Sequence, residues 1–576
     1  FEINLMKTKL LVNLKDLIVD LVTLLLVGLS VGFTLGIVSN LFVKGVMFLN
    51  NLRNENTLPD QFSVFSATFS LLTAALLILI IRKVFDISRW HGPPDSILAA
   101  HQSKNTLDIK RGLGSTLTAF ISAGGGASVG QYGPLVHFGA TMASIIEKFT
   151  SERLPPGIFI GCGVAAAISA GFNAPIAGLV FAHEAILRHF SLRAGGAIAI
   201  SSITASTIGS GFFIESEVLN LISEAPTLTQ ITPIILLVSP IFGLSAILFM
   251  FGIRFGAKIS KNSGLSPSYQ IFIAALLCGI IGIFIPEILG LGTTEMNNIF
   301  SEMYNISFLF ILLVGKIITT SICIGFGFFG GIFAPALFVG AASGGFIAKL
   351  IILLGFSVSI PAMAIAGTAA VGAVAIGAPV ATTLIVLEFT GSYEYAVAAM
   401  IAVQVSSFIS HRLYGDSLFD MALNDRGVKI GLGRQHVQMD SLTLSEIVNK
   451  DAIIFDEIHS HEKIKETMIN KKVTEAIVVG KNGLFVGKIN IHKILEKPEN
   501  SKLLAPSFIE KNSLVLSDNI SLAQAIEQAS NFVGEFIPVK NDKTGNFIGS
   551  VNEADLFQAY LKLQSQVLKV EKDTES

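Results

Sequence analysis

The chain has 576 residues, of which 51% are hydrophobic and 14% are charged, and its mean hydropathy is +0.66. These values exclude an ordinary water-soluble protein, in which about 25% of residues are charged, and they predict a chain that lies largely in lipid. The formal net charge of -2 gives no basis for binding nucleic acid or for a polybasic lipid anchor.

Apolar segments follow one another along most of the chain. Crossing about 30 Å of hydrocarbon takes roughly 20 apolar residues, and the apolar stretch within residues 7–49 is too long for a cleavable signal peptide. We predict membrane segments near 16–50, 63–86, 109–124, 133–150, 156–173, 175–190, 195–212, 229–260, 267–285, 305–328, 332–354, 357–390 and 393–411. The sequence therefore predicts an all-α polytopic membrane protein.

Glycine and proline interrupt several of these segments, where an unbroken lipid-facing helix would not tolerate them. Examples are Gly124-Gly125-Gly126, Gly133-Pro134, Gly330-Gly331 and Ala334-Pro335. We therefore expect helices that break inside the membrane.

The membrane part contains an internal repeat. Residues 133–140 match residues 334–341 at an offset of 201, and residues 174–184 match residues 378–388 at an offset of 204. Two matches at nearly one offset indicate a duplicated half. Duplicated halves with broken helices are typical of transporters and channels, in which the substrate site lies at the repeat interface.

The composition changes near Asp420, after which charged residues recur every few positions and predict a water-soluble tail. Residues 475–479 and 487–490 are echoed by residues 535–539 and 549–552. Each unit has a helix-strand-strand-helix pattern of about sixty residues. The predicted boundaries are a membrane domain 1–425 with repeats at about 16–212 and 229–425, a linker 426–437, modules 438–500 and 501–566, and a tail 567–576.

The three cysteines are Cys162, Cys278 and Cys323, which lie far apart in apolar segments. Their spacing fits neither a metal site nor a disulfide framework, so we expect buried, small hydrophobic side chains. No metal site is predicted.

A bare anion in hydrocarbon has a prohibitive desolvation cost, so a conducting site must replace water with fixed donors. Helix N-termini supply free backbone N–H groups and a macrodipole equivalent to about half a positive charge. Glycine lets the backbone approach an ion, and proline suits the first helical turn. Residues 130–134 and 330–335 both have this form, which indicates an anion site between two interrupted helices.

These residues resemble the CLC family of chloride channels and chloride/proton antiporters, and the resemblance covers essentially the whole chain. Residues 331–335 match the family's second-half filter loop, and residues 173–178 and 387–388 are close to their family segments. The tail resembles the paired CBS modules of many members. The resemblance implies a CLC-like inverted repeat, a homodimer with one pore per subunit, and chloride as the transported ion.

Two departures from the family pattern concern proton transport. Where the family has Gly-Lys/Arg-Glu-Gly-Pro, residues 130–134 read Gly-Gln-Tyr-Gly-Pro, so Tyr132 stands at the place of the glutamate that gates the pore and carries protons. A phenol stays neutral at physiological pH, whereas a carboxylate titrates. Alignment through Glu184 places Ala185 at the internal proton-relay glutamate. Both expected carboxylates are therefore missing.

Two further departures concern the central anion. Residues 90–95 stand in for the family's Gly-Ser-Gly-Ile-Pro-Glu, so His91 replaces the serine whose hydroxyl coordinates the anion. Phe419 stands where relatives have a tyrosine whose hydroxyl touches the same ion. We hypothesise that His91 and Tyr132 supply the lost donors. The alternatives are a turn hydrogen bond for His91 and a packing role for Tyr132.

The resemblance thus assigns the anion pathway to loop and helix-terminal residues, with backbone N–H groups providing most of the coordination. These residues are His91, Gly92, Gln131, Tyr132, Gly133, Gly331, Ile332, Phe333, Ala334 and Phe419, with Tyr132 at the gate and Ala185 at the lost proton-relay position.

Other polar residues of the membrane part have structural interpretations. Glu184 and Glu388 occupy equivalent ends of repeated helices. Intramembrane carboxylates are functional candidates by default, but this symmetry favours tying down a helix end or a subunit contact over a one-way proton relay. His137 is expected to serve helix packing.

In the tail, residues 549–555 resemble the CBS stretch whose aspartate holds a nucleotide ribose, which makes Asp555 a candidate nucleotide contact. The first module has Lys493 at the corresponding place, and Asn490 and Asn552 stand where relatives often have threonine. Adenine-nucleotide binding and a pure dimerisation or scaffolding role both stay open, and the second is favoured.

The sequence predicts a passive chloride channel or uncoupled anion transporter that needs no cofactor and lies in the lipid of the bacterial inner membrane, with cytoplasmic CBS modules. The alternative is a chloride/proton antiporter with a non-standard proton carrier, for which His91, His183 or Glu184 are candidates. An enzyme or nucleotide sensor with a membrane anchor is disfavoured, because the sequence has no nucleophile-base set, metal cluster or phosphate loop.

Overall fold

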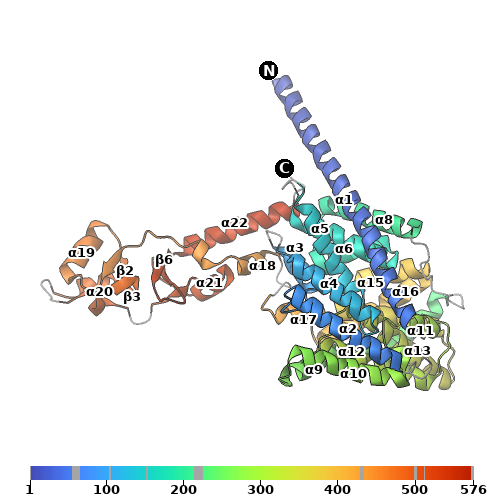
Figure 1. Ribbon diagram of the computed structural model, residues 1–576. Helices are drawn as coiled ribbons and strands as arrows, with labels where there is room; N and C mark the ends of the chain where they lie inside the picture. Colours follow the sequence, from blue (N-terminus) through green and yellow to red (C-terminus); the bar gives the residue numbers. More distant parts are fainter. Residues whose placement is uncertain are drawn as a thin grey trace. The chain divides into compact units, whose positions relative to one another are not determined.

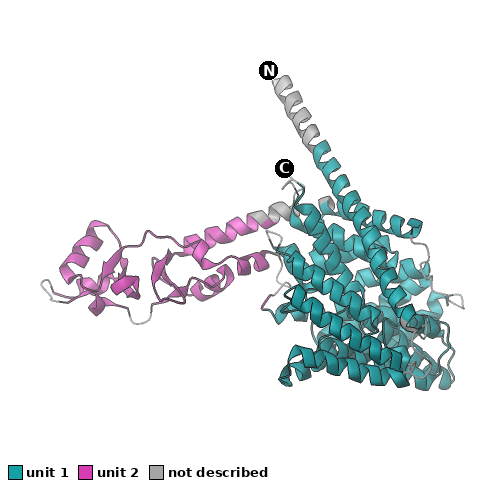
Figure 2. Cartoon of the chain, viewed as in Figure 1, with its two compact units in different colours: residues 1–426 teal, residues 427–576 magenta. Residues whose placement is uncertain are grey.

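Two units make up the chain in the computed structural model, residues 1–426 and residues 427–576 (Figure 2). The structure describes residues 2–54, 65–102, 106–150, 154–212, 225–428, 434–498, 503–510 and 513–572. The first unit is built from helices, and the second combines helices with two small sheets (Figure 1). The predicted fold class, a helical membrane domain followed by an α+β domain, is confirmed.

Helices of very different length make up the first unit. In chain order they are α1 (Glu2–Asn54), α2 (Ser66–Val84), α3 (Pro93–His101), α4 (Ile109–Gly124), α5 (Tyr132–Glu147), α6 (Pro156–Phe172), α7 (Pro175–Phe181) with the π-helical turn η2 (Ala182–Leu187), α8 (Leu192–Phe212), α9 (Leu228–Asn262), α10 (Pro267–Phe284), the 3-10 turn η3 (Pro286–Ile288), α11 (Thr293–Phe300), α12 (Ile306–Gly325), α13 (Phe333–Leu353), α14 (Ile360–Ile376), α15 (Pro379–Thr390), α16 (Tyr393–Leu413) and α17 (Leu418–Asn424).

Many of these helices are long and apolar enough to cross a bilayer. Within the described residues there are seven, at Ile18–Leu52, Ser66–Val84, Leu228–Asn262, Pro267–Phe284, Ile306–Gly325, Phe333–Leu353 and Tyr393–Asn424. Shorter apolar helices, such as α6 and α14, lie among them. The chain is therefore an integral membrane protein, as its composition predicts.

The predicted segment 357–390 is wrong as a single element, because two helices occupy it. α14 ends before Gly377, which has a left-handed backbone with φ of 73°, and Pro379 begins α15. The same break separates α6 from α7 in the first half, where Asn173 has φ of 51° and Pro175 follows. A left-handed residue ends one helix, and proline fits the first turn of the next.

Three helices, α3, α11 and α17, were not predicted from the sequence; they have 9, 8 and 7 residues. Helices of this length are too short to stand out by hydropathy alone. Two of them, α3 and α17, carry or adjoin residues of the predicted anion pathway.

Glycine pairs bring helices into close contact in both halves. A Cβ on Gly139 of α5 would collide with the carbonyl oxygen of Gly163 in α6, and the reverse is also true. Gly340 of α13 and Gly367 of α14 form the same mutual contact. Small residues let membrane helices approach this closely. One such pair in each half supports the predicted duplication.

A reciprocal pair of helix caps relates the two halves. The Glu184 carboxylate accepts hydrogen bonds from the backbone N–H groups of residues 380 (3.0 Å) and 381 (2.7 Å), at the start of α15. The Glu388 carboxylate accepts from residues 176 (2.9 Å) and 177 (2.8 Å), at the start of α7. The prediction that these glutamates tie down helix ends is confirmed. Each half caps a helix of the other.

The second unit contains two sheets of the same topology. Its elements are α18 (Arg434–Ser441), β1 (Ile454–Asp456), α19 (His461–Asn470), β2 (Glu475–Val479), β3 (Phe485–Asn490), α20 (Ile491–Leu495), β4 (Leu516–Ser517), α21 (Leu522–Ala529), β5 (Ile537–Lys540), β6 (Phe547–Val551) and α22 (Glu553–Lys572). The sheet orders are β1-β2-β3 and β4-β5-β6, and in each the first pair is parallel and the second antiparallel. A helix makes each parallel crossover. The helix-strand-strand-helix unit predicted from the sequence did not include β1 or β4, the first strand of each sheet.

Segments are exchanged between the two sheets. Residues 439–448 precede β1 but pack into the hydrophobic core of the second sheet, and Asn449 forms a bridge with Ser550. Residues 503–509 follow the first sheet and pack into its core. The predicted division between residues 500 and 501 therefore separates sequence repeats but does not separate packing units.

All three cysteines are free and buried, as predicted. Cys278 of α10 and Cys323 of α12 lie 3.5 Å apart, Sγ to Sγ, a proximity that their sequence spacing did not indicate. Among the described residues, no group of three or more His, Cys, Asp or Glu side chains could hold a metal ion.

Candidate functional site

The N-terminal ends of α5 and α13 meet within the first unit. The Gly130 N–H donates to the Gly331 carbonyl oxygen at 2.6 Å, and the Gly331 N–H donates to the Gly130 carbonyl oxygen at 2.5 Å. The two residues form an isolated antiparallel bridge. The prediction that the two glycine-rich loops converge is confirmed. We call this contact the loop bridge.

The loop bridge requires glycine at three positions. A Cβ on Gly331 would lie 2.8 Å from the backbone N of Gly133, and one on Gly130 would lie 3.0 Å from the Gly331 carbonyl oxygen. A Cβ on Gly133 would lie 3.1 Å from the Gly331 Cα. Because these spaces admit little more than hydrogen, a side chain at any of them would push the helix ends apart.

Backbone donors gather where the two helices begin. In α5 the hydrogen bond from Leu135 N–H to the Gln131 carbonyl is 3.1 Å long, and in α13 the equivalent bond from Ala336 N–H to Ile332 is 3.0 Å. The N–H groups that precede these donors have no acceptor inside the helix. With the positive ends of two helix macrodipoles, they make a site suited to an anion.

An aromatic cluster lies beside the loop bridge. The Tyr132 ring stacks on Phe172 with centroids 3.8 Å apart, and Phe333 meets Phe172 edge-to-face at 5.7 Å. Tyr132, Phe172 and Ala334 also line a cavity of about 270 Å³ that extends along α1 to Asn40. Phe172, which the sequence analysis did not identify, therefore connects two predicted pathway residues.

Gln131 and Ile332 occupy the equivalent N-cap positions of α5 and α13, and both have helical backbone angles. Gln131 is fully buried, and within the described residues neither its amide oxygen nor its amide nitrogen has a hydrogen-bond partner. A buried amide without partners has a large desolvation cost. An anion in the pathway could accept from its Nε2, and Ile332 offers no such donor, so the two halves are chemically unequal.

The loop that precedes α3 lies against the other two. The Trp90 ring stacks on Phe329, which precedes the loop bridge in the second half, at a centroid distance of 5.4 Å. A Cβ on Gly133 would lie 3.7 Å from Pro93 Cγ. The three loops that the sequence analysis assigned to the anion pathway, including the one that carries His91, therefore come together.

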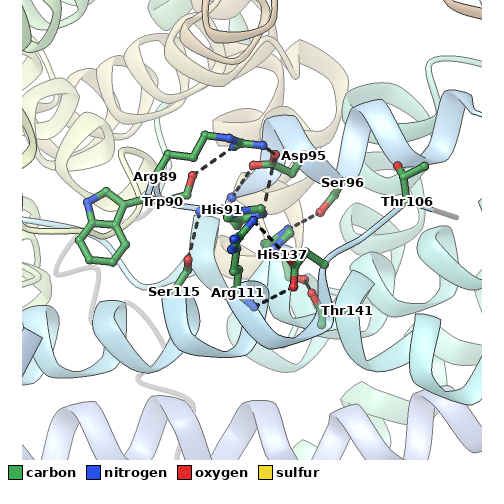
Figure 3. A network of polar contacts seen from close by, with 12 residues as sticks. Arg89, Trp90, His91, Asp95, Ser96, Thr106, Arg111, Ser115, His137 and Thr141 are labelled. Atoms are coloured by element: carbon green, nitrogen blue, oxygen red, sulfur yellow. Dashed lines mark hydrogen bonds and ion pairs between the residues drawn. The ribbon is translucent and has the colours of Figure 1, made fainter. Parts of the chain in front are cut away.

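His91 is buried and oriented by its neighbours (Figure 3). Its backbone N–H donates to Ser115 Oγ at 3.0 Å. Its ring Nδ1 lies 4.0 Å from Asp95 Oδ1, and its ring centroid is 6.2 Å from that of His137. Among the described contacts, none joins the His91 ring to Tyr132, so its role as an anion donor stays a prediction.

Asp95 lies at the centre of this first loop with only 7% of its surface exposed. Its Oδ1 accepts a hydrogen bond from Arg89 Nη2 at 2.7 Å (Figure 3). The same oxygen accepts from Arg426 Nη1 at 2.9 Å, and Oδ2 accepts from the Gly92 N–H at 3.0 Å. Charge-assisted bonds of this kind are strong. Asp95 was not predicted as a site residue, although an acidic residue at the third helical position is a capping signal.

His137 joins α5 to α3 through a polar contact. Its Nδ1 lies 2.9 Å from Ser96 Oγ (Figure 3), and within the described residues its Nε2 has no hydrogen-bond partner. Thr141, one turn further along α5, bonds back to the His137 carbonyl oxygen. The predicted packing role of His137 is therefore incomplete, because the side chain belongs to the polar network around the first loop.

Phe419 is buried in α17, and this helix packs against α3 and α14. Ion pairs hold this segment, with Arg188 2.8 Å from Asp420 in α17 and Arg254 3.3 Å from Asp425, the residue after the helix. The structure thus places Phe419 on a helix beside the first loop. Contact between its ring and an anion stays a prediction.

Ala185 is fully buried in η2, which follows α7. A methyl group at this position cannot bind a proton. The neighbouring Glu184 caps α15, and His183 is buried with its ring 4.9 Å from Phe190. Within the described residues, His183 Nδ1 has no hydrogen-bond partner.

In the second unit, Asp555 caps the start of α22. Its Oδ2 accepts from the Asn552 N–H at 3.0 Å, and its own N–H donates to Asn552 Oδ1 at 2.7 Å. The carboxylate that the sequence analysis proposed as a nucleotide contact therefore already has a structural role.

A duplicated helical membrane domain in which interrupted helices meet at their N-terminal ends defines a channel or secondary transporter, and the uncharged donors at the junction suit an anion. The chain belongs to the voltage gated chloride channel family, whose family model matches residues 73–411. It is thus a CLC-type anion channel or antiporter.

Known proteins with similar sequences and folds agree with this assignment. The chain is 26% identical over 384 residues to the voltage-gated ClC-type chloride channel ClcB of Escherichia coli, covering 65% of this chain and 91% of the relative. A slow cyanobacterial Cl-/H+ antiporter has a similar fold, with a TM-score of 0.63, 23% identity, and coverage of 70% of this chain and 97% of that one. A eukaryotic CLC transporter has a TM-score of 0.61 at 17% identity and covers 93% of this chain and 98% of its own.

Proposed function

We propose that the chain conducts chloride passively, without moving protons in exchange. The observation that carries this proposal is the loop bridge between Gly130 and Gly331. It brings together two helix N-terminal ends, each of which offers free backbone N–H donors. Backbone N–H groups can replace the water around a halide, and because they carry no full charge they do not trap it.

The residues at the two proton-handling positions support passive transport. Tyr132 stands at the gate position and is stacked on Phe172, and Ala185 stands at the relay position. A phenol does not release its proton at physiological pH, and alanine has no proton to release. Glu184, next to Ala185, already accepts two backbone hydrogen bonds from α15.

The second candidate function is chloride/proton antiport. It is supported by the similar fold of a Cl-/H+ antiporter and by the buried His183, which lies beside Glu184 and has an unpartnered Nδ1 within the described residues. His91 is a further candidate carrier, because its ring lies 4.0 Å from the Asp95 carboxylate.

Chloride efflux from liposomes tests these functions. The full-length protein is reconstituted, a chloride gradient is imposed with valinomycin present, and chloride and pH are recorded together. Passive conduction predicts chloride release with no proton movement. Proton movement in fixed proportion to chloride would instead support antiport. Absence of chloride release would favour a membrane-anchored enzyme or sensor.

We infer that the loops around Asp95 face the cytoplasm. Arg82, in the last turn of α2, bonds to the backbone of Ser88, Arg111 pairs with Asp86, and Arg426 pairs with Asp95. Basic residues concentrate on the cytoplasmic side of membrane proteins. The tail follows directly after Arg426 and would then also be cytoplasmic. Since the relatives named above include a bacterial protein, we propose the bacterial inner membrane as the location.

We also propose a homodimer in the lipid bilayer. The helices α7, α8, α15 and α16 carry large apolar side chains that are exposed within one chain. They are Ile176, Ile203, Val380, Met400 and Phe408. An apolar surface of this kind suits either lipid or a second copy. A cysteine at Phe408 that crosslinks between subunits in membranes, with one at Leu236 of α9 as a control, would support the dimer.

For the tail we propose scaffolding or dimerisation over nucleotide binding. Asp555 is already engaged with Asn552 at the start of α22. Calorimetric titration of the full-length protein with ATP tests this. Saturable binding that Asp555→Ala removes would establish nucleotide binding instead.

A further inference from the structure

We infer that Asp95 is a positioning residue for the anion pathway, because it fixes the His91-Gly92 loop against Arg426, two residues after the end of α17. This inference rests on the proposed function, because its test measures anion permeation. Asp95 and its arginine partners, Arg89 and Arg426, are not among the predicted pathway residues, whereas Gly92 is. Asp95 acts by holding the backbone of residues that do.

The carboxylate of Asp95 makes one contact within its loop and one with a distant helix end. Oδ2 accepts from the Gly92 N–H at 3.0 Å and thereby fixes the residue that follows His91. Oδ1 accepts from Arg426 at 2.9 Å, and Arg426 is the last residue of the first unit. A bond across 331 sequence positions thus connects the first loop with the chain that leaves the membrane part.

The Asp95 carboxylate also binds a second arginine. Arg89 Nη2 lies 2.7 Å from the same Oδ1. Asp95 is only 7% exposed, whereas the Arg89 and Arg426 side chains are 51% and 31% exposed. The carboxylate itself is therefore buried, and the charge-assisted bonds from the two arginines offset its loss of water. The loop that carries His91 is therefore held from both sides of the carboxylate.

Three ion pairs fix α17 and the residues after it, and each pair joins this segment to a different part of the first unit. Asp420 pairs with Arg188 after η2, and Asp425 pairs with Arg254 of α9. Of the three, the pair between Arg426 and Asp95 is the one that reaches a predicted pathway loop. The Arg254–Asp425 pair therefore offers a matched control, since it anchors the same segment without touching that loop.

The test measures the chloride-to-nitrate permeability ratio of the full-length protein in liposomes. The variants are Asp95→Asn, Arg426→Gln, the double variant and the control Arg254→Gln. We expect Asp95→Asn and Arg426→Gln each to change the ratio by about threefold, in the same direction, because both loosen the Gly92 backbone. The double variant should change it no further, since contacting residues are not additive. Arg254→Gln should leave the ratio unchanged.

The outcomes separate this inference from the function on which it rests. A wild-type protein that passes no chloride would overturn the proposed function. A conducting wild type would overturn the inference alone if the variants kept its ratio, if their effects added, or if Arg254→Gln shifted the ratio equally. Should Asp95→Asn fail to fold, the partly exposed Arg426 provides the deciding comparison with Arg254.

Discussion

At the scale of single residues, the proposed gate residue Tyr132 belongs to an aromatic stack. Tyr132 lies on Phe172, and Phe333 meets the other edge of Phe172. Aromatic contacts of this type contribute about 0.5–1.5 kcal/mol beyond burial. Movement of Tyr132 away from the stack would therefore have a modest cost, and protonation would not control it.

Introducing a carboxylate at this position should make conduction depend on pH. We expect chloride efflux through Tyr132→Glu to be about tenfold slower at pH 7.5 than at pH 4.5, because glutamate has an ordinary pKa of about 4.3 and the ionised side chain competes with chloride. Tyr132→Phe keeps the ring and should show no such pH dependence. The measurement is chloride efflux from liposomes across this pH range. Equal pH profiles for the two variants would contradict the assignment of Tyr132 to the gate.

The sequence identified part of this site, and physical reasons explain the rest. The loop bridge could be predicted because glycine and proline mark interrupted helix ends in both halves. Phe172 could not, because its contact with Tyr132 depends on how α6 packs against α5. Asp95 stood in a loop that matched the family poorly, and the importance of its carboxylate depends on Arg426, which is distant in sequence.

At the scale of helices, carboxylates from each half stabilise the other half. Glu388 accepts two backbone hydrogen bonds at the start of α7, and Glu184 accepts two at the start of α15. A negative charge at a helix N-terminus also interacts favourably with the macrodipole. These caps therefore lock the relative position of the two repeats.

Removing either cap should destabilise the membrane domain. We expect Glu388→Ala to lower the free energy of unfolding by about 1–3 kcal/mol, because it leaves two backbone N–H groups without their acceptor. Glu388→Gln keeps an acceptor and should cost less. Thermal denaturation in detergent measures the effect, and Glu302→Ala, at an exposed turn position, is the control. Equal melting temperatures for Glu388→Ala and Glu302→Ala would refute this role.

Glycine contacts between helices lead to a separate prediction. Gly340→Ala should destabilise the protein by about 1–3 kcal/mol, because its Cβ would collide with the Gly367 backbone and force α13 away from α14. Gly196→Ala in α8 meets no atom within 4 Å and should be neutral or slightly stabilising. Thermal denaturation in detergent compares the two. A Gly340→Ala variant as stable as Gly196→Ala would show that the close contact is not needed.

The sequence predicted which segments form helices better than it predicted where each helix begins and ends. The apolar segments gave the positions of α4, α9 and α10 within a few residues, because burial in lipid demands long apolar runs. The interval 357–390 concealed two helices, since both are apolar and only Gly377 and Pro379 mark the break. The closeness of Cys278 and Cys323 follows from the packing of α10 on α12, which no local pattern encodes.

At the scale of the whole molecule, the two units are stabilised by different means. The membrane unit relies on small residues and helix caps, whereas the second unit is an α+β fold whose sheets share exchanged segments. A buried ion pair lies where the two sheets' segments meet. Lys488 Nζ lies 2.9 Å from Glu475 Oε1, and Glu475 Oε2 accepts from the N–H groups of Glu535 (2.9 Å) and Phe536 (3.3 Å).

Breaking this ion pair should loosen the connection between the two sheets. Lys488→Met leaves the Glu475 charge buried without its partner, and we expect the local stability to fall by about 3–5 kcal/mol. Adding Glu475→Gln removes that charge while an amide oxygen still accepts the two N–H groups, so the double variant should recover more than half of the loss. Hydrogen exchange of β2 and β5 in the full-length protein measures both effects. Lys481→Met, at an exposed position, is the control, and a double variant no more protected than Lys488→Met would mean that packing, and not charge, holds the sheets together.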